Sequence, residues 1–333
     1  MNNLNATITA FGKYLPEKIL DNHDFEKMVD TSDKWIRERT GIVERHIADD
    51  DEAASDMGIK AFQNMHDRFD IDPAEIDLII VATITPDMFF PNTAAIIQES
   101  IGAKNAWGFD LSAACSGFVY ALETARRYVE SGAYKKVLLI SSEKMSAITD
   151  YEDRSTCVLF GDAGTAVLLE PTEEDEGVLD SILEMDGMGQ DYLYMKGGGS
   201  RNPATHETVD KKMHYIYQNG RPVFKYAVNN MVDAGTRLID RNGVDSEDLA
   251  LFIPHQANKR IIDACSSRLD LDDDQVMINI QKYGNTTAAT IPLGIIDAYD
   301  EGRLQKGDLA LLTAFGGGFT WGATLFKWGI END

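Results

Sequence analysis

Three side chains of this 333-residue chain have the chemistry of an acyl-transfer site: Cys115, His255 and Asn285. A thiolate is a strong nucleophile, an imidazole exchanges protons near neutral pH, and a carboxamide donates a hydrogen bond without changing its charge. Together they predict nucleophilic catalysis at a carbonyl carbon, with donors for the oxygen that becomes negative. A lone cysteine among alanines is more often a small buried hydrophobe, so the prediction depends on the three side chains meeting.

The nucleophile is expected at the beginning of a helix. Residues 109–111 (Phe-Asp-Leu) are typical of the end of a buried strand, residues 112–114 of a tight turn, and apolar positions from Ser116 onward recur at helical spacing. Cys115 would then lie at a helix N-terminus, where free N–H groups and the macrodipole favour the thiolate by about 0.3 to 1 kcal/mol. We therefore expect a lowered pKa for this thiol, and its small neighbours leave room for an acyl group.

His255 also follows an apolar strand, and a helix is predicted over residues 256–269. Strand ends that face a crevice are where α/β proteins place ligands. Further along, Gly316, Gly317 and Gly318 let the backbone approach a ligand closely, and their N–H groups could form an oxyanion hole with that of Cys115. A flexible hairpin is the alternative interpretation of these glycines.

An internal repeat indicates how distant residues could meet. An acidic turn that runs into an apolar strand occurs twice, at residues 72–83 and 245–255. Gly132 follows Cys115 by 17 residues, as Gly302 follows Asn285. The spacing predicts that Cys115 and Asn285 occupy matching positions in two copies of one α/β unit. Such a duplication would stack two layered halves and bring matched loops together at a pseudo-twofold axis.

Composition excludes several classes of protein. With 44% hydrophobic and 26% charged residues the chain is an ordinary globular protein, and a formal charge of −24 argues against nucleic acid or anionic membrane as a partner. Three widely separated cysteines fit a reducing cytoplasm better than a disulfide framework, and no CxxC pair suggests a metal. The N-terminal stretch has no features of a secretory signal. The uncharged run 309–326 is predicted to be strand, glycine loop and strand, with no membrane span.

The chain resembles a known family, β-ketoacyl-acyl carrier protein synthase III, over nearly its full length. The matching strings, in chain order, are Asp30–Gly41, Asp110–Phe118, Asp153–Arg154, Phe160–Asp162, Pro254–Arg260, Tyr283–Thr287 and Ala314–Gly322. The resemblance implies an α/β thiolase-type fold with duplicated halves in a five-layer α/β/α/β/α arrangement. It also implies a homodimer in which Phe90 reaches the partner's acyl pocket.

The expected division is an N-terminal half over residues 1–170 with the nucleophile, a connecting segment over 171–222 that shapes the substrate pocket, and a C-terminal half over 223–333 with His255 and Asn285. Within the connection, residues 196–217 are predicted to form a long loop, either a lid near the site or a surface insertion.

The resemblance further implies a decarboxylative Claisen condensation that initiates fatty acid biosynthesis. Cys115 would take the acyl group of an acyl-CoA primer, with the amides of Cys115 and Gly317 holding the oxyanion. Malonyl-acyl carrier protein would then lose carbon dioxide while His255 and Asn285 hydrogen-bond the enolate oxygen. Acyl-CoA is a substrate here, and neither a metal nor a redox cofactor is expected.

Further binding roles come from the same resemblance. The residues implied in binding acyl-CoA and the primer are Trp35, Arg39, Arg154, Asn258, Phe315 and Phe90, and those implied in carrier-protein docking are Gln256, Arg260 and Lys225. Two departures from the family pattern, a shorter glycine string at residues 160–166 and Thr313 in place of an acidic residue, leave the three catalytic side chains untouched. The primer, whether acetyl, branched or longer, stays open. Two alternative functions also stay open: a specialised ketosynthase of secondary metabolism and a type III polyketide synthase.

Overall fold

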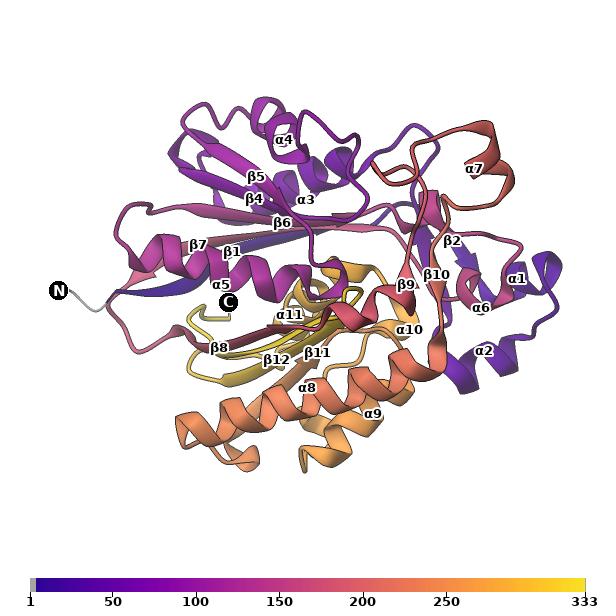
Figure 1. Cartoon of the computed structure of the whole chain (residues 1–333). Coiled ribbons are helices and arrows are strands. Elements are labelled where there is room, and N and C mark those ends of the chain that lie inside the picture. Colours follow the sequence, from indigo (N-terminus) through magenta and orange to yellow (C-terminus); the bar gives the residue numbers. More distant parts are fainter. Residues whose placement is uncertain (1–3, 333) are drawn as a thin grey trace.

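The computed structural model describes residues 4–332. Two β-sheets lie face to face with helices between them and on both outer faces, which gives five layers (Figure 1). The predicted α/β/α/β/α arrangement is confirmed.

The first sheet has the strand order β1-β7-β6-β4-β5. Its strands are β1 (Asn5–Tyr14), β4 (Leu78–Ala82), β5 (Trp107–Leu111), β6 (Val137–Glu143) and β7 (Ala163–Thr172). Every residue of β4 is buried, because helices cover both faces of the sheet. β5, by contrast, is the edge strand and is only partly buried in the single chain, so the prediction of a buried strand before Cys115 was wrong.

The second sheet repeats this pattern with the order β11-β12-β13-β8. Its strands are β8 (Gly177–Met185), β11 (Leu249–Pro254), β12 (Leu309–Gly316) and β13 (Thr320–Lys327). β11 runs parallel to β12, and β13 runs antiparallel to β12. In the first sheet β4 is likewise parallel to β6, and β7 is antiparallel to β6. β8 pairs with β13, so residues 177–185 belong to this sheet although they precede the C-terminal half. The run 309–326 is a β-hairpin, as predicted.

Three layers of helices enclose the sheets (Figure 1). They are α3 (Ala54–Phe69) with α4 (Thr93–Ile101) on the first sheet, α5 (Gly117–Glu130) with α11 (Thr290–Asp300) between the sheets, and α8 (Gly220–Asn242) with α9 (Lys259–Arg268) on the second. α5 buries Phe118, Ala121, Leu122 and Ala125, the helical spacing seen in the sequence. Within residues 4–332 no helix is both long and apolar enough to cross a membrane.

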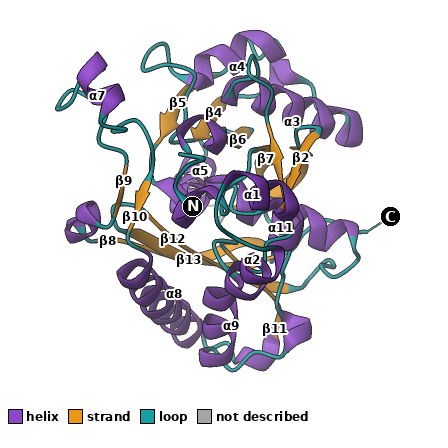
Figure 2. Cartoon of the chain, turned by 90° about the vertical axis from the view of Figure 1, so that its right-hand side faces the viewer, coloured by secondary structure: helices purple, strands orange, loops and turns teal. Residues whose placement is uncertain are grey.

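Smaller elements gather at one end of the molecule, on the right in Figure 1 and toward the viewer in Figure 2. They are β2 (Lys18–Asp21), α1 (Asn22–Met28), α2 (Asp33–Thr40), β3 (Glu44–Ile47), α6 (Arg154–Cys157), β9 (Leu193–Tyr194), α7 (His206–Asp210), β10 (Tyr217–Gln218) and α10 (Ile280–Tyr283). Ser32 caps α2 by accepting from the N–H of Trp35 at 3.2 Å. Single 3₁₀ turns lie at Pro73–Glu75, Ala114–Ser116, Met145–Ile148, Gly187–Asp191, Ser246–Asp248, Asp273–Gln275 and Thr287–Ala289.

The two halves are matched, but the predicted pairing of Cys115 with Asn285 was wrong. The central helices α5 and α11 each follow a 3₁₀ turn whose first residue has positive φ: Ala114 at 47° and Thr287 at 53°. This places Ala288, and not Asn285, opposite Cys115 in the repeat. α5 has 14 residues and α11 has 11. Residues at the same distance before Gly132 and Gly302 therefore do not occupy equivalent positions in the two halves. The two turns do meet, since a Cβ added at Gly117 would lie 3.1 Å from Cβ of Ala288.

Candidate active site

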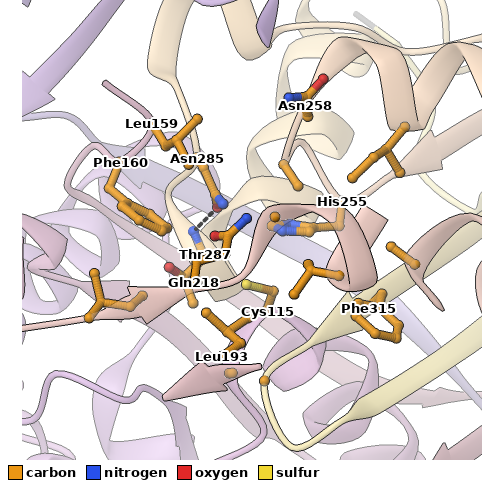
Figure 3. Close-up of a pocket in the computed structure, with 18 of the residues that line it drawn as sticks. Cys115, Leu159, Phe160, Leu193, Gln218, His255, Asn258, Asn285, Thr287 and Phe315 are labelled. Carbon is orange, nitrogen blue, oxygen red and sulfur yellow. Dashed lines mark hydrogen bonds between the residues drawn. The ribbon is translucent and has the colours of Figure 1, made fainter. Parts of the chain in front are cut away.

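One cavity of about 870 Å³ lies where the two halves meet, and Cys115, His255 and Asn285 all line it. Figure 3 shows the three side chains directed toward one another. They come from the 3₁₀ turn before α5, the end of β11 and the loop after α10. The structure thus brings together the three residues on which the sequence prediction depends.

The turn that bears Cys115 is held against the β12–β13 hairpin. A Cβ on Gly316 would lie 2.7 Å from the backbone nitrogen of Cys115, so only glycine allows this approach. Thr320 Oγ1 donates to the carbonyl of Ala113 at 3.0 Å, and Ser116 Oγ donates to the carbonyl of Thr320 at 3.0 Å. These contacts fix the nucleophile from the side of the second sheet.

Burial raises the pKa of the Cys115 thiol to about 12, and the charge of Glu143 adds to the rise. The N–H of Cys115 itself and the hydroxyl of Thr287 act in the opposite direction. The expectation of a lowered pKa was therefore wrong for the free enzyme. A helix N-terminus contributes about 0.3 to 1 kcal/mol, which is less than the cost of taking a thiolate out of water.

His255 is held as a neutral imidazole with one nitrogen free. Its backbone N–H donates to the carbonyl of Thr313 at 2.8 Å, and its Nδ1 lies 2.6 Å from Oγ1 of Thr290. That hydroxyl donates to the carbonyl of Thr287 at 3.1 Å, so it accepts from Nδ1–H, and Nε2 carries the lone pair. Nε2 is buried and has no partner among the described residues. Burial lowers the pKa of His255 to about 3.

Asn285 is oriented by a hydrogen bond within its own turn. Its Oδ1 accepts from the N–H of Thr287 at 3.0 Å, the dashed line in Figure 3. The carboxamide oxygen is therefore engaged, and Nδ2 is the atom left to donate. The backbone is fixed too, because Asn285 N–H donates to the carbonyl of Leu159 at 2.9 Å and its carbonyl accepts from Gly161 N–H at 3.2 Å.

The hairpin after β12 supplies the remaining wall of the cavity. Gly317 lines the cavity, and a Cβ there would come within 3.7 Å of Cβ of Ala114. The placement is compatible with a second oxyanion donor, which stays a prediction. Phe315 also lines the cavity, is 4% exposed, and packs on Phe319 with ring centroids 4.7 Å apart.

Four of the predicted coenzyme residues lie around the cavity mouth. Trp35, Arg39 and Asn258 line it, and the guanidinium carbon of Arg154 lies 4.4 Å from the centroid of the Trp35 ring. Arg154 does not itself line the cavity. Asn258 also caps α9, because its Oδ1 accepts from the N–H of Arg260 at 2.9 Å.

The predicted docking residues divide into two groups. Arg260 and Lys225 are exposed, and Arg260 lies at the cavity with its guanidinium carbon 5.5 Å from the Phe224 ring. Gln256 is only 1% exposed: its amide donates to the carbonyls of Pro254 and Met277, and its Oε1 accepts two backbone N–H groups. The structure contradicts a docking role for Gln256, because every polar atom of its side chain is engaged inside the chain.

Phe90, on the loop between β4 and α4, is 85% exposed and does not line the cavity of its own chain. The predicted loop over residues 196–217 is flanked by the cavity: Leu193 and Met195, just before it, and Ile216, near its end, line the wall, while α7 in its middle has no buried residue. The segment is therefore part pocket wall and part surface.

Sequence reasoning missed Thr287, Thr290 and Arg221, which surround or line the cavity. Three threonines within a buried helix start, in Asn285-Thr-Thr-Ala-Ala-Thr290, were the available signal, because buried hydroxyls need partners. No group of three or more histidine, cysteine or acidic residues that could hold a metal is found in the part of the chain that the structure describes.

A duplicated five-layer fold with a buried cysteine, histidine and asparagine between its halves defines a thiolase-type condensing enzyme. Comparisons agree: models of 3-oxoacyl-[acyl-carrier-protein (ACP)] synthase III and of its C-terminal part match residues 109–187 and 239–328. The beta-ketoacyl-[acyl-carrier-protein] synthase III of Koribacter versatilis is 54% identical over 325 residues, 97% of this chain and 98% of that protein.

Solved structures give the same result. The crystal structure of 3-oxoacyl-[acyl-carrier-protein] synthase III from Aquifex aeolicus has a TM-score of 0.90 and 43% identity, covering 97% of this chain and 100% of that one. The priming β-ketosynthase of the R1128 polyketide biosynthetic pathway has a TM-score of 0.92 and 32% identity, covering 100% and 98%. This chain belongs to the β-ketoacyl-acyl carrier protein synthase III family.

Proposed function

We propose that this enzyme condenses an acyl-CoA primer with malonyl-acyl carrier protein to give a 3-oxoacyl-acyl carrier protein, the step that initiates fatty acid biosynthesis. The observation that carries the proposal is the cavity shared by Cys115, His255 and Asn285, in which residues 4–332 give neither His255 Nε2 nor Asn285 Nδ2 a hydrogen-bond partner. A nucleophile and two separate hydrogen-bonding nitrogens are what a two-step condensation through one acyl-enzyme requires.

In the first step the Cys115 sulfur attacks the thioester carbonyl of the primer. Nε2 of His255 accepts the thiol proton, and the coenzyme A thiolate takes this proton as it leaves. Because burial disfavours the charged form of the thiol and of the imidazole alike, the proton passes from sulfur to Nε2 as the sulfur attacks, and no free thiolate has to form first. The tetrahedral oxyanion is held by the N–H groups of Cys115 and Gly317.

In the second step the malonyl carboxylate leaves as carbon dioxide, and its bonding pair forms an enolate. Nε2 of His255, which gave its proton to coenzyme A, takes up one proton from solvent for this step, and Nε2–H and Asn285 Nδ2 hydrogen-bond the enolate oxygen. The enolate carbon attacks the acyl group, and the Cys115 thiolate leaves and takes the proton from Nε2. One proton is consumed per turnover, which balances the carboxylate that is lost. Phe315, buried beside the site, keeps water from the enolate.

Coenzyme binding by Trp35, Arg39, Arg154 and Asn258 is part of this proposal. Their position at the mouth, opposite the buried nucleophile, supports it. An indole and a guanidinium suit the faces of an adenine, and Arg39 suits phosphate. Arg260 and Lys225 would meet the carrier protein. Acyl-CoA is a substrate, and the proposed steps require neither a metal nor a redox cofactor.

A homodimer is proposed as the working form. β5 is a partly buried edge strand, and beside it Phe89 and Phe90 are 80% and 85% exposed. Such a surface is typical of an interface. Phe90 would enter the acyl pocket of the partner. The three unpaired cysteines fit a reducing compartment, which supports a cytoplasmic enzyme.

A specialised ketosynthase of secondary metabolism is the second candidate function, since the priming ketosynthase of a polyketide pathway shares the fold. The far closer relatives named synthase III make it the less favoured one. Intact-mass analysis with a panel of acyl-CoA thioesters, followed by malonyl-carrier protein or malonyl-CoA, tests both. We expect acylation of Cys115 and extension from the carrier only; extension from malonyl-CoA alone would contradict the proposal.

A further inference from the structure

Arg45, on β3, is a fully buried cation that forms no ion pair within residues 4–332, although the charge of Asp21 acts on it from a greater distance. It is 0% exposed, and among the described residues its guanidinium hydrogen bonds go to neutral oxygens. Burying a charge in this way is expensive, and an apolar side chain of the same volume would avoid the cost. A specific use of the guanidinium would explain why an arginine is placed here.

The guanidinium donates to three oxygens: Oδ1 of Asn22, the carbonyl of Val43 at 3.4 Å, and the carbonyl of Val158, which leads to the active site. Nη1 donates to Oδ1 of Asn22 at 2.6 Å, and the Phe25 ring lies beneath the cation at 4.7 Å. Nε, at 3.1 Å, and Nη2 both donate to the carbonyl of Val158. A fork that binds one carbonyl with two donors fixes that peptide in direction as well as in position.

The residues after Val158 pair with the backbone of Asn285. The carbonyl of Leu159 accepts from Asn285 N–H at 2.9 Å, Gly161 N–H donates to the Asn285 carbonyl at 3.2 Å, and Phe160 and Asn285 form a parallel bridge. The Val158 carbonyl that Arg45 binds belongs to the peptide that links Val158 to Leu159. The position of this peptide therefore determines where Leu159 holds Asn285.

The aliphatic part of Arg45 supports the same bridge. A Cβ on Gly284, the residue before Asn285, would lie 3.0 Å from Arg45 Cγ, and one on Gly161 would lie 3.3 Å from Arg45 Cβ. The arginine stem thus fills the space beside both strands of the bridge. Cys115 and His255, by contrast, are held by residues 113, 290, 313, 316 and 320, whereas the hydrogen bonds of Arg45 go to residues 22, 43 and 158.

We propose that Arg45 is a positioning residue for Asn285 and so acts on the decarboxylation and condensation step, not on the acylation of Cys115. The proposal rests on the proposed function, in which Asn285 serves only the second step. Loss of the guanidinium fork would let residues 158–161 shift and carry the Asn285 carboxamide away from the enolate oxygen. Cys115 and His255 would move less, because the β12–β13 hairpin holds Cys115 and the Thr313 carbonyl holds the backbone of His255.

The test compares the two steps in Arg45→Lys, whose single ammonium cannot reproduce the fork. Acylation of Cys115 by the accepted acyl-CoA is followed by rapid quench and intact mass, and carbon dioxide release is measured from malonyl-carrier protein with the enzyme already acylated. We expect acylation within about 3-fold of the wild type and carbon dioxide release lower by about 10-fold or more, since small misplacements have effects of this size.

Two controls separate positioning from general damage. Arg126→Lys changes another largely buried arginine, whose guanidinium donates to the carbonyl of Leu179 on β8 and does not line the cavity, so both rates should stay near the wild type. Adding Arg45→Lys to Asn285→Ala should bring no further loss of decarboxylation, because the two residues act through one group. Equal loss in both steps, or independent losses in the double variant, would overturn the proposal.

If Arg45→Lys does not fold, Asn22→Ala tests the same claim with the arginine retained. It removes one holder of the guanidinium, and we expect a smaller loss confined to the second step; equal loss in both steps again counts against the proposal. If the wild type itself releases no carbon dioxide from malonyl-carrier protein, the proposed function fails instead. The two failures are therefore distinguishable.

Discussion

Nδ1 of His255 lies 2.6 Å from Oγ1 of Thr290, and this contact decides which nitrogen of the imidazole is reactive. The threonine hydroxyl has one hydrogen, which is directed to the carbonyl of Thr287 at 3.1 Å. The N–H of Thr287 in turn holds Oδ1 of Asn285. A single turn with positive φ at Thr287 therefore fixes both the histidine tautomer and the carboxamide orientation.

Replacing Thr290 by valine should slow acylation of Cys115. The variant leaves Nδ1–H buried without an acceptor, a cost of about 1 to 3 kcal/mol or about 5- to 150-fold in rate. The imidazole would then favour the tautomer with hydrogen on Nε2, which cannot accept the thiol proton. Rapid-quench mass analysis measures the rate, and Thr290→Ser, which keeps the hydroxyl, should restore most of it. A wild-type rate in the valine variant would show that the hydroxyl does not set the tautomer.

Alkylation of Cys115 in the free enzyme should be slow and should rise steeply with pH. Because burial raises the pKa of this thiol to about 12, only about one thiol in ten thousand is ionised at pH 8. Only the thiolate reacts, so the iodoacetamide rate should rise about tenfold per pH unit from pH 7 to 10. Peptide mapping separates Cys115 from Cys157 and Cys265, which are also buried. A plateau below pH 9 would mean that the helix N-terminus outweighs burial.

Asn285→Ala should separate the two steps. The variant keeps Cys115 and His255, so acylation should stay within about 3-fold of the wild type. Decarboxylation should fall by about 100- to 1000-fold, the effect of removing one oxyanion donor. Asn285→Asp, matched in size, should fall as far, because its charge repels the enolate. The measurement is carbon dioxide release by the acylated enzyme, and an equal loss of acylation would place Asn285 in both steps.

The trio and the duplicated fold could be predicted from sequence because both depend on local patterns. Apolar strands followed by reactive side chains marked Cys115 and His255, and a glycine loop marked the hairpin that adjoins them. The length of each helix depends on the tertiary contacts that it makes, which the sequence pattern does not reveal. The three-residue difference between α5 and α11 could therefore not be predicted, and the repeat was misaligned.

The predictions that were wrong concern properties that depend on tertiary burial. The pKa of Cys115 is governed by how completely the closed cavity excludes water, which no spacing reveals. Gln256 stands between His255 and Asn258 in a string with reactive neighbours, yet its side chain turns inward to bond four backbone groups. Arg45 likewise resembles a surface arginine in the sequence and is fully buried in the structure.

Arg260→Glu should raise the Michaelis constant for malonyl-carrier protein far more than that for the primer. Carrier proteins are acidic, and this chain has a formal charge of −24, so docking requires a local basic patch that overcomes the overall repulsion. Arg260 is exposed at the cavity mouth, where that patch would act. Lys306→Glu, equally exposed but not at the cavity, is the matched control and should leave both constants unchanged. Raised salt should reduce the difference between Arg260→Glu and the wild type by screening. Similar increases for both substrates would assign Arg260 to the coenzyme and not to the carrier protein.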